Sequence, residues 1–233
     1  MTPASAGTLQ LIVGPMFSGK STELLRQIHR NRSIGRTVLV VNHAQNQRYN
    51  STGLTTHDAE FVPAEEDCVR TEQLHDLLDV TSPLHAAFQR ADMVVIEELQ
   101  FFADAYETVT HIVRHTTKCI VAAGLIADYR REPFGDVLRL MPYADQITHL
   151  RGLCCLCRDG TPGPFTRRRT RHAAEPTMLV AAADVYEVVC RRHYDDGDGN
   201  GAHQVGDEDD VGEMAVTSQR LRAEGVEEGC RLH

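Results

Sequence analysis

The chain has 233 residues, of which 42% are hydrophobic, and a formal net charge of −9 at pH 7. This length is enough for one well-filled core with a small appended module. No apolar run approaches the ~20 residues of a membrane span, and the N-terminus lacks the basic-then-apolar layout of a signal peptide. We therefore expect a cytoplasmic protein with no membrane partner.

The negative charge is concentrated near the C-terminus. Residues 194–233 contain eleven acidic residues and three arginines, whereas residues 1–193 contain 22 acidic and 21 basic residues. The near-neutral part has no basic face of the kind that binds nucleic acid, so no nucleic-acid partner is expected. Residues 194–233 have too little apolar content to offset the entropy of ordering and are predicted to be a disordered acidic tail. Asp195–Gly201 resembles part of a calcium loop, but no glutamate occupies position twelve, which favours the tail.

Short β-branched runs alternate with longer segments of helical spacing along most of the chain. The predicted strands are Leu9–Val13, Thr37–Asn42, Asp92–Ile96, Cys119–Ala123 and Gln146–His149, and the predicted helices are Ser21–Arg32, Ser82–Arg90 and Ala103–Lys118. Apolar strands separated by helices indicate an α/β domain with a parallel sheet flanked by helices on both faces. The alternation stops after Arg151, so we expect a domain of residues 1–150 followed by a small module of residues 151–193.

A phosphate-binding loop is predicted between the first strand and the first helix. Its eight residues fit G-x-x-x-x-G-K-[ST]: Gly14, Pro15, Met16, Phe17, Ser18, Gly19, Lys20 and Ser21. In this pattern backbone N–H groups surround the phosphates of a nucleotide, Lys20 reaches the terminal phosphates, and the Ser21 hydroxyl faces Mg²⁺. The positive N-terminal end of the following helix adds to the attraction. A chance match in an ordinary turn is the alternative, and the strand and helix on either side argue against it.

Two acids, Glu97 and Glu98, end the apolar strand Asp92–Ile96. A kinase with a phosphate loop needs a carboxylate for Mg²⁺ and a base near the acceptor hydroxyl, and adjacent residues at a strand end point in different directions. The alternative is a solvated acidic turn, which the phosphate loop elsewhere in the chain makes less attractive.

A second cluster has the spacing of a structural zinc site. Cys154 and Cys157 form C-x-x-C, and Cys190 and His193 form C-x-x-H about thirty residues later. Cys155 has the wrong offset and is expected to be a bystander. A redox C-x-x-C is the alternative, but the strand-then-helix context of that motif is missing. The metal would staple a loop too polar to fold by burial alone.

With these three features in this order, the chain resembles the cytosolic, zinc-containing thymidine kinases, the type II family. The resemblance covers about Gly7 to His193. The motifs that carry it are Gly14–Leu24, Glu98 with Gln100-Phe101-Phe102, and Arg130 with Pro133-Phe134-Gly135. It implies a P-loop NTPase-type α/β fold with a small C-terminal zinc-binding module and a thymine-covering loop.

The resemblance implies roles for three charged residues. Glu98 aligns with the general base that accepts the 5′-hydroxyl proton, and Glu97 with an acid, usually aspartate, that helps to hold Mg²⁺. Arg48 matches an arginine near the 5′-oxygen and the transferring phosphoryl group. Because Glu97 and Glu98 are neighbours, an exchange of their roles stays open.

The resemblance also implies a set of residues around the nucleoside. Apolar and aromatic side chains would enclose the base, with the first of them near the thymine methyl group: Met16, Phe101, Leu125, Tyr129 and Phe134. Backbone groups of a loop at about Thr166 to Ala183 would read the thymine edge, with Thr177 and Leu179 nearest the base. Tyr186 would support the sugar end, and Phe102 is expected to be core.

The predicted function is transfer of the γ-phosphoryl group of ATP to the 5′-hydroxyl of thymidine, which supplies DNA synthesis through nucleotide salvage. The cofactors implied are ATP, Mg²⁺ and structural Zn²⁺. The family implies deoxyuridine and analogues as further substrates, feedback inhibition by dTTP, and a homotetramer. Two alternatives stay open: a kinase of another deoxynucleoside, and an ATP-binding zinc protein that regulates or binds nucleic acid without chemistry. The near-neutral body and the paired Glu97 and Glu98 weaken the second.

Overall fold

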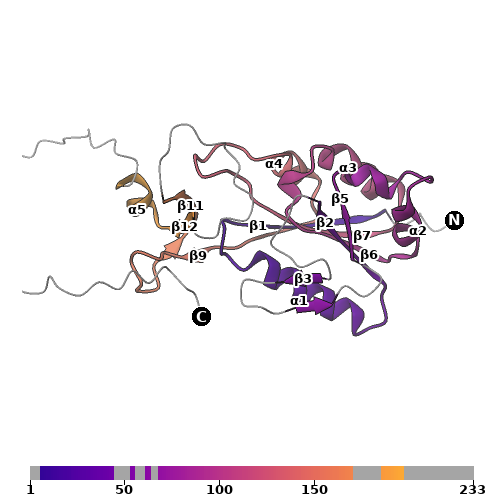
Figure 1. Ribbon diagram of the computed structural model, residues 1–233, viewed down its shortest axis with the longest axis horizontal. Coiled ribbons are helices and arrows are strands. Elements are labelled where there is room, and N and C mark those ends of the chain that lie inside the picture. Colours follow the sequence, from indigo (N-terminus) through magenta and orange to yellow (C-terminus); the bar gives the residue numbers. More distant parts are fainter. Residues whose placement is uncertain (1–5, 45–52, 56–60, 64–67, 170–184, 197–233) are drawn as a thin grey trace, which may run out of the picture.

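The computed structural model describes residues 6–44, 53–55, 61–63, 68–169 and 185–196, and Figure 1 shows its architecture. Its centre is a six-stranded sheet in the order β5-β2-β6-β7-β1-β8, in which every neighbouring pair is parallel. The strands are β1 (Thr8–Val13), β2 (Val38–His43), β5 (Cys68–Thr71), β6 (Met93–Ile96), β7 (Cys119–Gly124) and β8 (Gln146–His149). The predicted α/β fold with a parallel sheet is confirmed.

Helices cover both faces of this sheet, with α1 on one face and α2, α3 and α4 on the other (Figure 1). The helical segments are α1 (Lys20–Arg32), η1 (Leu74–Leu77), α2 (Pro83–Arg90), η2 (Leu99–Phe101), α3 (Ala105–His115), α4 (Val137–Leu140) and η3 (Met141–Tyr143). Among the described residues, no helix has the length and apolar character that a membrane crossing requires.

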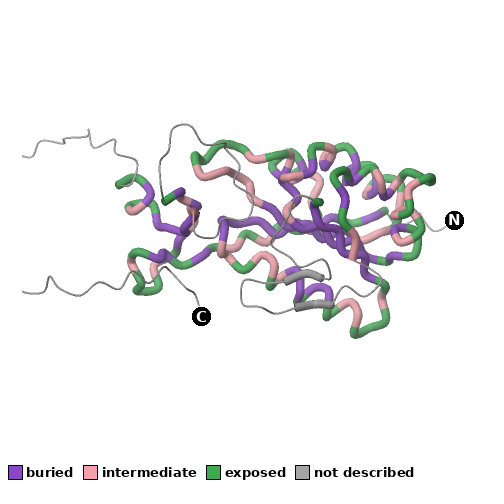
Figure 2. The backbone as a smooth tube through the Cα atoms, in the orientation of Figure 1, coloured by how far each residue is buried: buried purple, intermediate pink, exposed green. Residues whose placement is uncertain are grey.

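Two apolar cores lie on opposite faces of the sheet because side chains alternate along each strand. In β2, Leu39 and Val41 join the core beneath α3, whereas Val38 and Val40 pack with Leu24 of α1. All six residues of β2 are buried, and Figure 2 shows the continuous buried zone along the central strands. Burial on both faces explains why these strands are largely apolar in sequence.

Several elements differ from the sequence-based prediction, and two of these differences have a local explanation. The helix predicted over 103–118 spans Ala105–His115, because the Asp104 carboxylate accepts hydrogen bonds from the backbone N–H groups of Leu74 and His75 instead of extending the helix. The edge strand β5 was not predicted at all. Only four residues long and directly after an acidic stretch, it has no distinctive periodicity and is defined by its pairing with β2.

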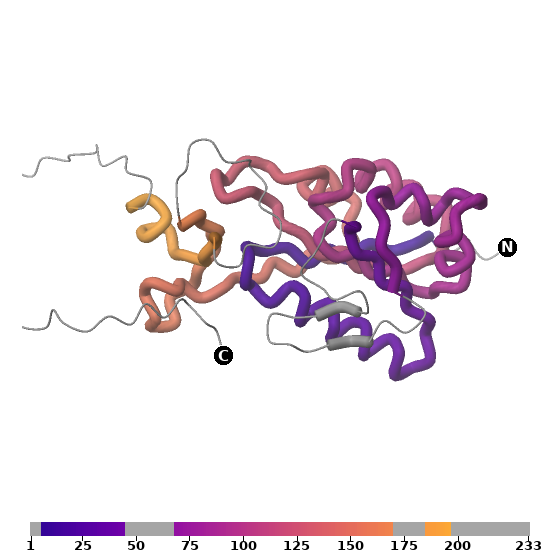
Figure 3. The backbone as a smooth tube through the Cα atoms, viewed as in Figure 1, coloured from indigo at the N-terminus to yellow at the C-terminus, as the bar shows by residue number. Residues whose placement is uncertain are grey.

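The C-terminal part forms a small module beyond the carboxyl end of the sheet, which Figure 3 shows the chain entering directly from β8. Its elements are β9 (Gly152–Leu153), β10 (Pro162–Gly163), β11 (Phe165–Arg168), β12 (Tyr186–Val189) and α5 (Arg191–Asp196). β9 pairs with β10 and β11 with β12, and a separate hairpin joins β3 (Gly53–Thr55) to β4 (Phe61–Pro63). Helix α5 continues past the boundary at residue 193, and the remainder of the predicted tail, 197–233, lies outside the described residues.

One of the two lysines in the chain, Lys118, stabilises the end of α2. Its ammonium group donates to the carbonyl oxygens of Ala91 (2.6 Å) and Gln89 (3.2 Å) and lies 4.7 Å from the ring centroid of Phe88. Carbonyls at a helix C-terminus lack intrahelical partners, and a cation there is favourable.

We expect Lys118→Met to lower the free energy of unfolding by about 1–2 kcal/mol, because it removes charged hydrogen bonds and a cation–π contact. Urea unfolding at neutral pH measures this loss. Arg90→Met is the matched control, because it removes an exposed cation of α2, the helix whose end Lys118 contacts. It is expected to lower the free energy of unfolding by no more than about 0.5 kcal/mol. Equal losses in the two variants would contradict the role given to Lys118.

Candidate active site

The phosphate loop joins the end of β1 to the start of α1. Two of its residues have left-handed backbone conformations, Phe17 (φ 57°) and Gly19 (φ 82°). The Lys20 ammonium group donates to the carbonyl oxygen of Pro15 at 2.7 Å, which bends the lysine back over the loop. Because the loop follows the carboxyl end of β1, the first turn of α1 lies at the carboxyl edge of the sheet, where ligands of parallel sheets bind.

A hydrogen bond joins the phosphate loop to the acidic end of β6. The Ser21 hydroxyl donates to Glu97 Oε1 at 2.7 Å, although β7 separates β6 from β1 in the sheet. Glu97 is only 2% exposed. A hydroxyl beside a carboxylate is a pair of hard oxygen donors, which fits the ligand preference of Mg²⁺.

Glu98 faces a different partner from that of Glu97. It has a left-handed backbone conformation (φ 52°, ψ 47°), and its Oε2 accepts a hydrogen bond of 2.6 Å from Gln100 Nε2. Gln100 Oε1 in turn accepts from the backbone N–H of Leu125 at 3.0 Å. The two acids therefore reach separate parts of the site, one toward α1 and the other toward the end of β7.

Aromatic residues from three segments lie near this edge. The rings of Phe101 and Phe134 meet edge to face with their centroids 5.7 Å apart, and those of Tyr129 and Tyr186 are 6.1 Å apart. His43, at the end of β2, packs against Phe101 at 5.9 Å, and burial lowers the pKa of this imidazole. Phe102 is fully buried in the core, as the sequence predicted.

The C-terminal module contacts the phosphate loop directly. The backbone N–H of Met16 donates to Thr166 Oγ1 of β11 at 3.0 Å, in a buried hydrogen bond. A Cβ added at Gly14 would lie 2.6 Å from the carbonyl oxygen of Leu150, so only glycine allows the loop to approach the segment that leads into the module. On the other side, the Tyr194 hydroxyl of α5 donates to the carbonyl oxygen of Tyr129 at 2.7 Å.

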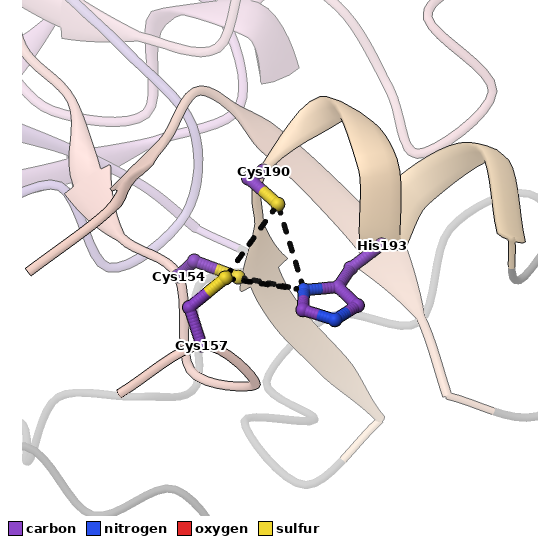
Figure 4. Close-up of side chains that lie close together, drawn as sticks. All are labelled: Cys154, Cys157, Cys190 and His193. Carbon is purple, nitrogen blue, oxygen red and sulfur yellow. Dashed lines mark hydrogen bonds between the residues drawn. The ribbon is translucent and has the colours of Figure 1, made fainter. Parts of the chain in front are cut away.

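Four side chains of the module converge on one point, as Figure 4 shows: Cys154, Cys157, Cys190 and His193. His193 Nδ1 lies 3.3, 3.4 and 3.5 Å from the sulfur atoms of Cys154, Cys157 and Cys190, and the last two sulfurs are 3.8 Å apart. Tetrahedral zinc with Zn–S of about 2.3 Å and Zn–N of about 2.0 Å places sulfurs about 3.8 Å apart and sulfur about 3.5 Å from nitrogen. The cluster could therefore hold zinc with little rearrangement.

The thiols of this cluster differ in acidity. Burial opposes ionisation of Cys154, but hydrogen bonds from the backbone N–H groups of Cys157 and Cys190 and from His193 lower its pKa to about 6. Desolvation and the adjacent Cys154 sulfur raise the pKa of Cys157 to about 11. The thiolate is the form that binds metal, so the lowered pKa of Cys154 favours its role as a metal ligand.

A partly buried ion pair, Arg167 with Glu187, lies next to the candidate metal ligands. Arg167 Nε donates to Glu187 Oε1 at 2.8 Å, and the same guanidinium reaches the carbonyl oxygen of His193. Cys155 points away from the cluster, with its sulfur 3.5 Å from Glu187 Oε2. It therefore lies outside the set of four, as its spacing predicted.

Three predicted site residues, Arg48, Thr177 and Leu179, lie outside the described residues. The structure adds two side-chain contacts that the sequence analysis did not predict, those of Thr166 with Met16 and of Gln100 with Glu98. Gln100 had been named only as part of the family motif, where it stands as a polar residue between Leu99 and Phe101. Thr166 had been named only as the start of the predicted loop, and its contact with Met16 spans 150 residues.

Comparison with known proteins identifies relatives over most of the chain. A family model described as thymidine kinase matches residues 7–194. Thymidine kinase of Oryza sativa subsp. japonica is 37% identical over 196 residues, 84% of this chain and 69% of that protein. Thymidine kinase a of Arabidopsis thaliana is 37% identical over 190 residues (81% and 75%), and cytosolic thymidine kinase of Gallus gallus is 32% identical over 189 residues (81% and 77%).

A parallel sheet whose first strand leads into a G-x-x-x-x-G-K-S loop, with acids at the end of a second strand, defines a nucleotide-binding α/β protein of the phosphate-loop class. Within that class, the chain belongs to the thymidine kinase family. The resemblance found in its sequence motifs is confirmed.

We expect the purified protein to contain about one zinc per chain, because four ligands close a structural site. Cys157→Ser should lose the metal, since a hydroxyl is a poor zinc ligand, and metal analysis of the dialysed protein measures this. Cys155→Ser is the matched control and should keep its zinc. A metal-free wild-type protein, or zinc lost from the Cys155 variant and kept by the Cys157 variant, would refute the ligand set.

Proposed function

We propose that this protein transfers the γ-phosphoryl group of ATP to the 5′-hydroxyl of thymidine and releases thymidine monophosphate and ADP. The observation that carries the proposal is the hydrogen bond of 2.7 Å from Ser21 to Glu97. It brings the phosphate-loop hydroxyl and a buried carboxylate together at the ligand-binding edge of the sheet, with Glu98 next in the chain, in a protein whose relatives are named thymidine kinases.

The phosphate loop is assigned to ATP. Backbone N–H groups between Gly14 and Ser21 and the N-terminal end of α1 hold the phosphates, and Lys20 exchanges its contact with Pro15 for the terminal phosphates. Ser21 and Glu97 would hold Mg²⁺, which neutralises charge on the phosphate oxygens when bound. Support for this assignment comes from Ser18 Oγ, which is buried at the loop and has no hydrogen-bond partner within the described part of the chain, because such atoms are rare unless a ligand or water completes them.

Glu98 is assigned as the base that accepts the proton of the 5′-hydroxyl. Its carboxylate is only partly buried and faces away from the Ser21–Glu97 pair, so an acceptor hydroxyl can approach it without displacing that pair. Arg48 is proposed to stabilise charge on the transferring group, by its match to the family motif alone. Positioning and electrostatic stabilisation supply most of the catalysis in phosphoryl transfer.

The nucleoside is proposed to bind among apolar and aromatic side chains beside Glu98, namely Met16, Phe101, Leu125, Tyr129, Phe134 and Tyr186. The edge-to-face contact of Phe101 with Phe134 and the proximity of Tyr129 to Tyr186 support this grouping. Thr177 and Leu179 are assigned to the thymine edge by the family motif. Deoxyuridine and thymidine analogues are proposed as further substrates.

The chain is proposed to divide into a kinase domain of residues 1–150, a zinc module of residues 151–193 and an acidic tail of residues 194–233. The contacts of the module with Met16 and Tyr129 suggest that zinc stabilises the nucleoside site and not the module alone. A cytoplasmic location, a homotetramer and inhibition by dTTP are further proposals that follow from the family.

An assay with radiolabelled ATP and a panel of nucleosides tests the function. We expect label on thymidine and more weakly on deoxyuridine, and none on purine deoxynucleosides. Faster turnover of another deoxynucleoside would show that thymidine is not the preferred substrate and would assign a different kinase specificity. Binding of ATP without transfer to any nucleoside would favour the non-enzymatic alternative.

Glu98→Gln is the sharpest test of the base, because it keeps the size of the side chain and removes its ability to accept a proton. We expect normal binding of thymidine and ATP, with kcat reduced by roughly 10²–10⁴-fold. Glu97→Gln should instead show a defect that lessens as the magnesium concentration rises. Near-normal kcat for Glu98→Gln, with Glu97→Gln inactive at every magnesium concentration, would exchange the two roles.

A further inference from the structure

We propose that Gln100 is a positioning residue that holds the Glu98 carboxylate in its catalytic orientation and ties it to the strand end at Leu125. This inference rests on the proposed function, in which Glu98 is the base. One buried amide then fixes the position of the base relative to the nucleoside site.

The amide of Gln100 makes two hydrogen bonds that fix its orientation. Nε2 donates to Glu98 Oε2 at 2.6 Å, and Oε1 accepts from Leu125 N at 3.0 Å. A carboxylate can only accept and a backbone N–H can only donate, so the reverse orientation of the amide would lose both bonds. The contacts themselves therefore settle which end is oxygen and which is nitrogen.

The backbone of Gln100 is held as firmly as its side chain. A Cβ added at Gly135 would lie 2.5 Å from the Gln100 carbonyl oxygen and 2.9 Å from its Cα, and Gly135 has a positive φ of 59°. The segment that carries Phe134 thus packs directly onto η2. Gln100 is 4% exposed, so little free volume is available for an alternative side-chain conformation.

This arrangement meets a specific need of Glu98. Its left-handed backbone places the side chain at the turn between β6 and η2, just after the last residue of the strand. The Gln100 amide donates to the Glu98 carboxylate and is itself held by Leu125 at the end of β7, so it fixes the direction of the Glu98 side chain. Because Oε1 of the same amide holds Leu125, a residue assigned to the nucleoside site, the distance between base and nucleoside depends on one rigid group.

Gln100→Glu tests this role, because it keeps an acceptor for Leu125 N and replaces the donor to Glu98 with a second carboxylate. We expect the KM for thymidine to stay within about 3-fold and kcat to fall about 10- to 100-fold. Gln146→Glu, which adds the same charge at an exposed position of β8, is the matched control and should leave both constants unchanged. Should Gln100→Glu fail to give a cooperative thermal transition, Gln100→Asn replaces it. The shorter amide cannot reach both partners, and the same fall in kcat is expected.

A double-mutant cycle separates positioning from a structural effect. If Gln100 acts through Glu98, the Gln100 substitution should reduce kcat by less than about 2-fold once Glu98 is already glutamine. Additive losses in the cycle, or normal kcat in the Gln100 variant, would overturn the inference while leaving the function intact. If Glu98→Gln alone were fully active, the base assignment itself would fail, and this inference with it.

Discussion

The hydrogen bond between Ser21 and Glu97 is the contact on which the geometry of the site depends. It joins the first turn of α1 to the end of β6 across the intervening strand β7. The two residues meet only because the strands are in the right register: Val13 of β1 lies beside Gly124 of β7, and Ile96 of β6 lies beside Ala122. A slip of one residue in either pair would turn the side chains after it to the opposite face and separate the phosphate loop from its acid.

The C-terminal module contacts this site directly, through two hydrogen bonds. Met16 of the phosphate loop is bonded to Thr166 of β11, and Tyr129, near the aromatic residues, is bonded to Tyr194 of α5. The metal-ligand cluster joins the two ends of the module, because two of its residues precede β10 and the other two follow β12, directly before Tyr194. Arg167 connects the two strands of the module to α5 through Glu187 and the carbonyl oxygen of His193. Loss of a metal from this cluster would therefore disturb both contacts of the module with the rest of the chain.

The sequence predicted the features that depend on local pattern. Buried parallel strands are largely apolar, the phosphate loop has a fixed spacing, and zinc ligands come in pairs, so the fold and the four residues that could hold a metal could be predicted. Features that arise from tertiary contacts could not. Strand β5 exists because β2 has a free edge, α3 begins late because Asp104 is engaged by η1, and Thr166 reaches Met16 only once the module has folded back.

The left-handed backbone of Glu98 has a consequence for how the protein can evolve. A glutamate in this conformation is strained by about 1 kcal/mol or more, whereas glycine at the same position is not. Selection for thermal stability alone would thus favour replacing Glu98, and with it the carboxylate proposed as the base. Under the proposed role of Glu98, stability and turnover oppose each other at this position, so stabilising substitutions are best sought in the cores and surface helices, with the turn after β6 left unchanged.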